Sequence, residues 1–160
     1  MSEISAADNL SIEIQPQRWR LISNGFETAQ VIAEATHGKP LRFSHTFATR
    51  RRLPATGILP TEQVQQVVIG WSQQDEAWHL GLVLSQELAE VRGSRWCELA
   101  RWPDPDANLF LELAKEAGQY LAQVLQRPLN IIHPQPNQQA TPPPPKKSLP
   151  LSLGHWRFEE

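Results

Sequence analysis

The sequence predicts an α+β protein, built as one β-rich domain with a single amphipathic helix near its C-terminal end. Several short segments between residues 10 and 102 alternate apolar and polar residues, which is the pattern of half-buried strands. Between residues 106 and 126 apolar residues recur instead at steps of three and four, which predicts a helix. Strands that precede a helix in this way are typical of α+β domains, and 160 residues suffice for one such domain with tails. We expect a bent sheet or a partly open barrel.

The N-terminal residues 1–9 are polar and slightly acidic, and we expect them to be disordered. The next segment, LSIEI at residues 10–14, alternates and predicts a short strand. Residues 18–22 read RWRLI, place Trp19 and Leu21 on one side, and predict a second strand.

A turn is expected at Asn24 and Gly25, because this pair is a strong hairpin signal. The segment at residues 27–38 fits a helical stripe and a strand alternation equally well, and the preceding turn favours the strand. Residues 40–48 also alternate and predict a strand. Its common face would carry Leu41, Phe43, His45 and Phe47.

The stretch LPATG at residues 53–57 resembles the cell-wall sorting signal L-P-x-T-G. Such a signal is followed directly by an apolar membrane anchor and a basic tail, whereas a long alternating sequence follows here. Pro54 fixes its own φ angle and Gly57 allows a positive φ, so the stretch predicts a loop between two strands.

The middle of the chain predicts three neighbouring strands. Residues 64–71 and 77–84 flank the loop SQQDE and predict a hairpin. Both sides of the second of these strands are apolar, so we expect it in the centre of a sheet. Residues 94–102 predict the next strand.

The helix at about residues 106–126 is the clearest expected element. Asp104 or Asp106 can accept hydrogen bonds from the free N–H groups at its start, and Pro128 ends it. Residues 129–133 predict a last short strand or a capping segment. The apolar stripe of the helix consists of Phe110, Leu113, Ala117, Leu121 and Val124.

The C-terminal part changes composition twice. Residues 134–148 are rich in proline and glutamine and predict an extended linker. Residues 149–160 are apolar again, and we expect Leu151, Trp156 and Phe158 to dock this tail on its own domain as an added edge strand. A groove on a partner protein is the alternative.

The order of the predicted elements over residues 10–133 resembles the PH-like superfold, a bent β-barrel that a C-terminal helix closes at one end. PH-like domains serve as lipid-binding, peptide-binding and scaffold modules, so this resemblance implies binding rather than catalysis. The other possible architecture is a sheet with helices on one face.

Composition narrows the classes of function. A formal charge of −2 argues against a nucleic-acid-binding protein, which usually carries a basic domain. A single cysteine excludes an internal disulfide framework, and together with the polar N-terminus it predicts a cytoplasmic protein. We expect no transmembrane segment, because no stretch approaches the roughly 20 apolar residues that span a bilayer. We expect no cofactor and no metal, because no nucleotide-binding motif or local histidine pattern is present.

Two groups of residues are candidates for a functional site. Cys97, His45 and His79 are the candidates for a catalytic site assembled from dispersed residues. The window between Glu34 and Glu62 contains no acidic residue. The same window holds Lys39, Arg42, Arg50, Arg51 and Arg52, which could attract an anionic partner.

We therefore predict a soluble, non-enzymatic binding or protein-interaction module, whose partner is an unknown protein or a second copy of itself. The alternatives are an enzyme with a dispersed site and a peripheral binder of anionic surfaces. A polar cleft that brings two titratable groups together would favour the enzyme, and a surface that exposes the arginines together would favour the anionic-surface binder.

Overall fold

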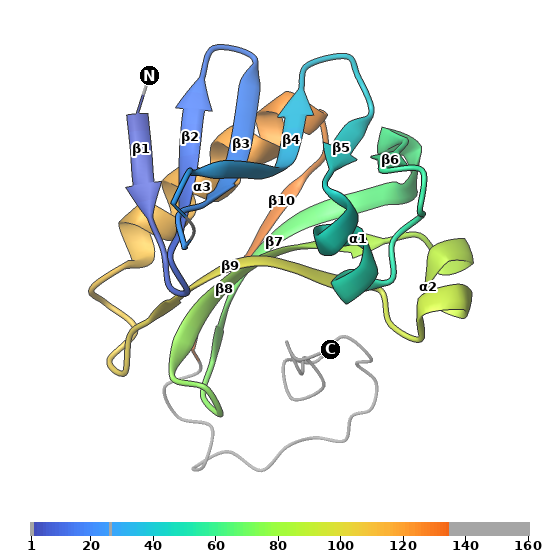
Figure 1. The fold of residues 1–160 in the computed structure, drawn as a ribbon. Helices are drawn as coiled ribbons and strands as arrows, with labels where there is room; N and C mark the ends of the chain where they lie inside the picture. The colour runs from blue at the N-terminus through green and yellow to red at the C-terminus, as the bar shows by residue number, and fades with distance from the viewer. Residues whose placement is uncertain (1, 26, 135–160) are drawn as a thin grey trace, which may run out of the picture.

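The computed structural model describes residues 2–25 and 27–134, which form two β-sheets and three α-helices around a shared core (Figure 1). The predicted α+β class is confirmed, with β-strands as the dominant element and a long helix near the end of the domain. The resemblance to the PH-like superfold stays a prediction. The expected tail at residues 149–160 and nearly all of the expected linker lie outside the described residues.

The first sheet, sheet A, is an antiparallel meander in which each strand pairs with the next along the chain. Its strands, in order, are β1 (Ser2–Ser5), β2 (Leu10–Gln15), β3 (Arg18–Ser23), β4 (Gln30–Thr36), β5 (Leu41–Phe43) and β6 (Ile58–Leu59). The strand assignment for residues 27–38 is thus confirmed by β4.

The second sheet, sheet B, has four strands in the order β10-β7-β8-β9. They are β7 (Val64–Ser72), β8 (Ala77–Leu84), β9 (Trp96–Pro103) and β10 (Leu129–Ile132). β10 runs parallel to β7, and the other neighbours are antiparallel. The predicted central position of residues 77–84 is confirmed, because β8 lies between β7 and β9 and every residue in it is buried.

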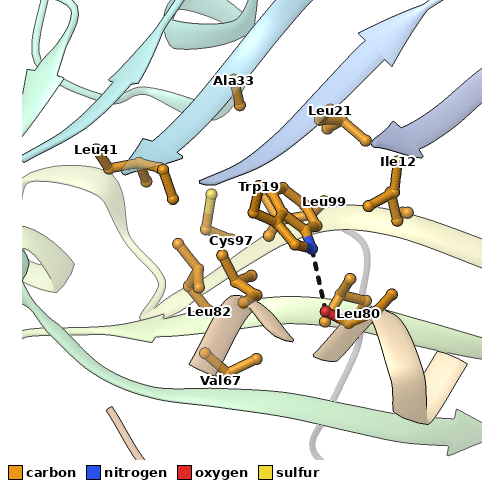
Figure 2. Close-up of a cluster of buried hydrophobic side chains, with 14 of the residues drawn as sticks. Ile12, Trp19, Leu21, Ala33, Leu41, Val67, Leu80, Leu82, Cys97 and Leu99 are labelled. Atoms are coloured by element: carbon orange, nitrogen blue, oxygen red, sulfur yellow. Dashed lines mark hydrogen bonds between the residues drawn. The ribbon is translucent and has the colours of Figure 1, made fainter. Parts of the chain in front are cut away.

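Helix α3 (Leu111–Leu125) contacts strands of both sheets and confirms the helix predicted near residues 106–126. The indole Nε1 of Trp19 in β3 donates a hydrogen bond of 3.0 Å to the backbone oxygen of Ala117 in α3 (Figure 2). Leu121 is fully buried, as expected, whereas Leu113 is 38% exposed and does not belong to the buried stripe. Asp104 Oδ2 accepts from the N–H groups of residues 109 and 110 in the loop before α3. It does not cap the helix as predicted, because α3 begins only at Leu111 and no side chain caps its start.

The core lies between the inner faces of the two sheets (Figure 2). Sheet A contributes Ile12, Trp19, Leu21, Ala33 and Leu41, and sheet B contributes Val67, Leu80, Leu82, Cys97 and Leu99. Each of these side chains is at most 2% exposed. The thiol of Cys97 is therefore part of the packed interior.

Two expectations for the N-terminal half are wrong. Residues 2–5 are not disordered, because β1 pairs with β2 along its whole length and buries Ile4. Residues 40–48 are not one strand, because β5 ends at Phe43 and helix α1 (His45–Arg51) follows. The Ser44 side chain accepts a hydrogen bond from the N–H of Phe47 and thereby caps α1.

The remaining connections contain two elements that were not predicted, the short 3-10 helix η1 (Thr61–Gln63) and helix α2 (Gln86–Arg92). The LPATG stretch forms a turn, as expected, but it joins α1 to β6 rather than two strands. Gly57 has a φ of 80°, which is the left-handed conformation that glycine adopts without strain.

Candidate functional site

A hollow of about 370 Å³ lies between α1 and the ends of β2, β3 and β4, and we call it the α1 hollow. It is lined by Asp8, Leu10, Ser23, Gln30, Ile32, Ser44, His45, Thr46, Phe47, Arg50 and Arg51. Its walls are apolar where Leu10, Ile32 and Phe47 contribute and polar elsewhere. This hollow therefore offers both apolar contact and hydrogen-bonding groups.

Helix α1 is held firmly against sheet A, so it can form a fixed wall of the α1 hollow. The backbone N–H of Ser44 donates 3.0 Å to the carbonyl oxygen of Ile32 in β4. One turn later Phe47 is buried and packs against Phe43, with their ring centroids 5.9 Å apart. The helix ends at Arg52, which adopts the left-handed conformation. The exposed side of α1 then carries His45, Thr46 and Arg50.

Arg51 connects α1 to sheet B. Its Nε donates 2.7 Å to the backbone oxygen of Glu98 in β9, and its guanidinium carbon lies 4.0 Å from the centroid of the Phe47 ring. Stacking on an aromatic ring and bonding to a carbonyl both hold the guanidinium in place. Arg51 therefore has a structural role in addition to lining the α1 hollow.

Arg52 turns away from the hollow, and one of its terminal nitrogens donates 2.8 Å to the backbone oxygen of Arg92 at the end of α2. Arg92 in turn is 3% exposed and donates from its Nε to the backbone oxygen of Arg51 at 2.8 Å. Its other two nitrogens donate to the backbone oxygens of Ser94 and Trp96, at 2.6 and 3.1 Å. These arginines join the end of α1 to α2 and β9.

The other two residues of the predicted basic group lie elsewhere. Lys39 is exposed in the turn between β4 and β5. Arg42 is exposed on β5, in register with Glu34 on the neighbouring strand. Of the five basic residues singled out in the sequence, the structure thus brings only Arg50 and Arg51 into the α1 hollow.

The charge around the α1 hollow is on balance positive. Asp8 is the single acidic residue among the described residues of its lining, and its carboxylate lies 3.3 Å from Nε of Arg101. That ion pair offsets the negative charge of Asp8. The guanidinium groups of Arg50 and Arg51 then dominate, so the hollow favours an anionic group over a cationic one.

The catalytic candidates lie apart from one another. His79 is 2% exposed on β8, with its Nδ1 2.8 Å from Glu98 Oε1 and its Nε2 3.0 Å from Asp75 Oδ2. Cys97 lies in the core on the other side of sheet B, and His45 lines the α1 hollow. In the described part of the chain no group of three or more potential ligands could hold a metal ion.

Several residues of the α1 hollow were not identified in the sequence, including Asp8, Ser23, Gln30 and Ile32. They come from three separate strand ends, and no short motif connects them. The predicted docking residues Leu151, Trp156 and Phe158 lie outside the described residues.

Comparisons with protein-family models, with curated proteins and with solved structures found no match for this chain. None of the helices within residues 2–25 and 27–134 has the length and apolar character needed to cross a membrane.

Proposed function

We propose that the protein is a non-enzymatic binding module, and that the α1 hollow binds a ligand with an anionic group attached to an apolar portion. The observation that carries this proposal is the lining of the hollow. Arg50 and His45 stand at an apolar surface formed by Leu10, Ile32 and Phe47. A carboxylate or phosphate near Arg50 would gain a charge-assisted hydrogen bond, and an attached alkyl or aryl group would lose contact with water.

The size of the hollow supports a small ligand or a short segment of a larger one. Sites for small molecules typically measure about 300–1,000 Å³ and combine apolar walls with a few placed polar groups. The α1 hollow, at about 370 Å³, lies at the lower end of that range. An extended protein–protein interface would need a wider surface than this hollow provides.

Burial argues against the enzymatic alternative. A general acid or base must come within hydrogen-bond reach of the group that it protonates or deprotonates. The side chain of His79, with a carboxylate near each ring nitrogen, exposes only 2% of its surface, and Cys97 exposes 1%. The accessible histidine of the α1 hollow, His45, lies with Arg50 rather than with either of them. This distribution suits binding better than proton transfer.

The structure also decides which variant tests the proposal. Replacing Arg50, Arg51 and Arg52 together would remove the backbone contacts of the last two, so loss of binding could follow from unfolding. Arg50→Glu changes a single arginine, which is exposed and lines the hollow. Arg42→Glu is the matched control, because Arg42 is also exposed but lies on β5 outside the lining.

The experiment is a titration of the full chain, labelled with ¹⁵N, with sodium hexanoate and with inorganic phosphate. We expect hexanoate to shift the backbone amide signals of His45, Thr46 and Arg50, and to bind more weakly as salt screens the arginines. Arg50→Glu should abolish these shifts and Arg42→Glu should keep them. Shifts that are the same in both variants, or no shifts at all in the wild-type protein, would refute the proposal.

A further inference from the structure

The outer face of sheet B, which points away from α3 and sheet A, carries a second apolar cluster. It consists of Val68 in β7, Val83 in β8 and Trp96 in β9, with Ile132 of β10 packed against them. All four strands of the sheet contribute, so the cluster runs across its whole width. We call it the outer cluster.

Trp96 lies flat on this face. A Cβ atom added to Gly81 would come within 2.5 Å of the Trp96 ring, so the ring rests directly on the backbone of β8. The β-bulge between Leu80 and Gly81 lies beside this contact. The ring of Trp96 therefore covers the backbone of β8 at Gly81.

The outer cluster is nevertheless buried. Val68 is 0% exposed, Val83 is 6% exposed and Trp96 is 7% exposed. Helix α3 and the core of sheet A do not cover it, because they pack on the other side of sheet B (Figure 1). Exposures this low mean that the three side chains are already shielded from water, and we ask which part of the chain shields them.

The described part of the chain ends beside the outer cluster. β10 is its last strand, and Ile132 of β10 packs against the outer cluster. Residues 135–160 therefore continue from the edge of this face. Within them the segment 149–158 reads LPLSLGHWRF and provides five large apolar side chains.

We propose that residues 149–158 dock on the outer cluster of their own chain and form the missing layer of sheet B. From Pro134 to Leu149 an extended chain at about 3.1 Å per residue reaches roughly 45 Å. A four-stranded sheet with strands about 4.8 Å apart is only about 15–20 Å wide, so the segment can reach any part of the face. A tether of this length also makes docking on the same chain effectively intramolecular, which favours it over a second copy at low protein concentration.

This proposal replaces the added edge strand that the alternation of Leu149, Leu151 and Leu153 predicts. The buried apolar side chains of the outer cluster lie on the face of sheet B rather than at an open strand edge. The anionic ligand proposed for the α1 hollow plays no part in this docking, so either proposal can fail without the other.

A nitroxide spin label on Ser152→Cys tests the docking directly in the full chain. Cys97 is 1% exposed, so the engineered cysteine is the reactive one. We expect the amide signals of Val68, Gly81, Val83 and Trp96 to lose most of their intensity when the label is paramagnetic, at every protein concentration. The matched control is the same label on Glu27→Cys, in the connection between β3 and β4, which should leave these signals unchanged.

A mixed sample separates docking on the same chain from docking on a second copy. Unlabelled protein with the nitroxide is added to ¹⁵N-labelled protein without it, and we expect no loss of signal at the outer cluster. Loss of signal in the mixed sample would show that a second copy covers the face. The proposal is also overturned if the ¹⁵N-labelled protein that itself carries the nitroxide keeps the full intensity of its outer-cluster signals, or loses intensity only at other residues. Leu151→Asp should abolish the effect without unfolding the domain.

Discussion

The side chain of Arg92 offers the sharpest test of how α1 and α2 are held to β9 of sheet B. Its guanidinium donates to three backbone oxygens, those of Arg51, Ser94 and Trp96, and its side chain is almost completely buried. Arg92→Met keeps most of the length of the side chain but removes all of its donors. The three carbonyl groups would then lose their shared partner.

The magnitude follows from the cost of breaking buried polar contacts. The net contribution of a hydrogen bond to a charged group is about 1.5–3 kcal/mol. The three bonds of Arg92 share one guanidinium group, so their contributions to stability do not add fully. Leaving a buried acceptor unsatisfied costs about 1–3 kcal/mol, and with three such carbonyls we expect Arg92→Met to lose about 3 kcal/mol. Arg92→Lys should lose less, although a single ammonium cannot reproduce the fork of a guanidinium.

The assay is urea unfolding followed by tryptophan fluorescence, with the midpoint and the slope measured for each variant. Arg95→Met is the matched control, because Arg95 lies three residues away and is only partly buried, with bonds to Leu84 and Gln65. We expect Arg95→Met to cost less than about 1 kcal/mol. Equal losses for the two variants, or a loss below about 1 kcal/mol for Arg92→Met, would refute the structural role assigned to Arg92.

Three further substitutions test the packing of the sheets and of α3. Gly81→Ala forces a methyl group against the Trp96 ring and should reduce stability by about 1–3 kcal/mol. The near-ultraviolet circular dichroism spectrum should change as well, and an unchanged spectrum and stability would contradict the contact. Trp19→Phe removes the N–H that bonds to α3 and should cost about 1–3 kcal/mol in thermal unfolding, whereas a neutral effect would show that this bond is dispensable. Leu121→Ala should cost about 2–5 kcal/mol in urea unfolding, and a loss typical of a surface residue would place it outside the core.

The regular part of the fold could be predicted because it depends on local patterns. Helix α3 repeats apolar residues at helical spacing, and β7 and β8 are long apolar segments that flank a short polar loop. Packing between the two sheets then reinforces what the local pattern favours. The same reasoning did not locate the start of α3, because Asp104 bonds to N–H groups of the loop before the helix.

The errors arose where alternation is short or tertiary contacts dominate. Phe43, His45 and Phe47 alternate over five residues, which is too short to separate β5 from the capped helix α1. Strand β1 has one buried side chain, Ile4, and exists because its backbone pairs with β2. Helix α2 did carry local signals that were not used, since Ser85 caps its start and Gly93 ends it with a positive φ.

The α1 hollow could be predicted only in part. The window without acidic residues drew attention to Arg50 and Arg51, and both line the hollow. The sequence could not show that Arg52 bonds to a backbone oxygen at the end of α2, because that oxygen is far away along the chain. Nor could it bring Leu10 and Ile32 beside α1, since the meander of sheet A creates that neighbourhood.

The most direct test of the α1 hollow as a ligand site is an isotope-filtered nuclear Overhauser experiment between hexanoate and the ¹³C-labelled full chain. We predict contacts from the hexanoate methyl group to the methyl groups of Leu10 and Ile32, with the carboxylate end near the side chain of Arg50. Contacts that appear only at the outer cluster of sheet B, or no contacts at a concentration that shifts the amide signals, would contradict the proposed site.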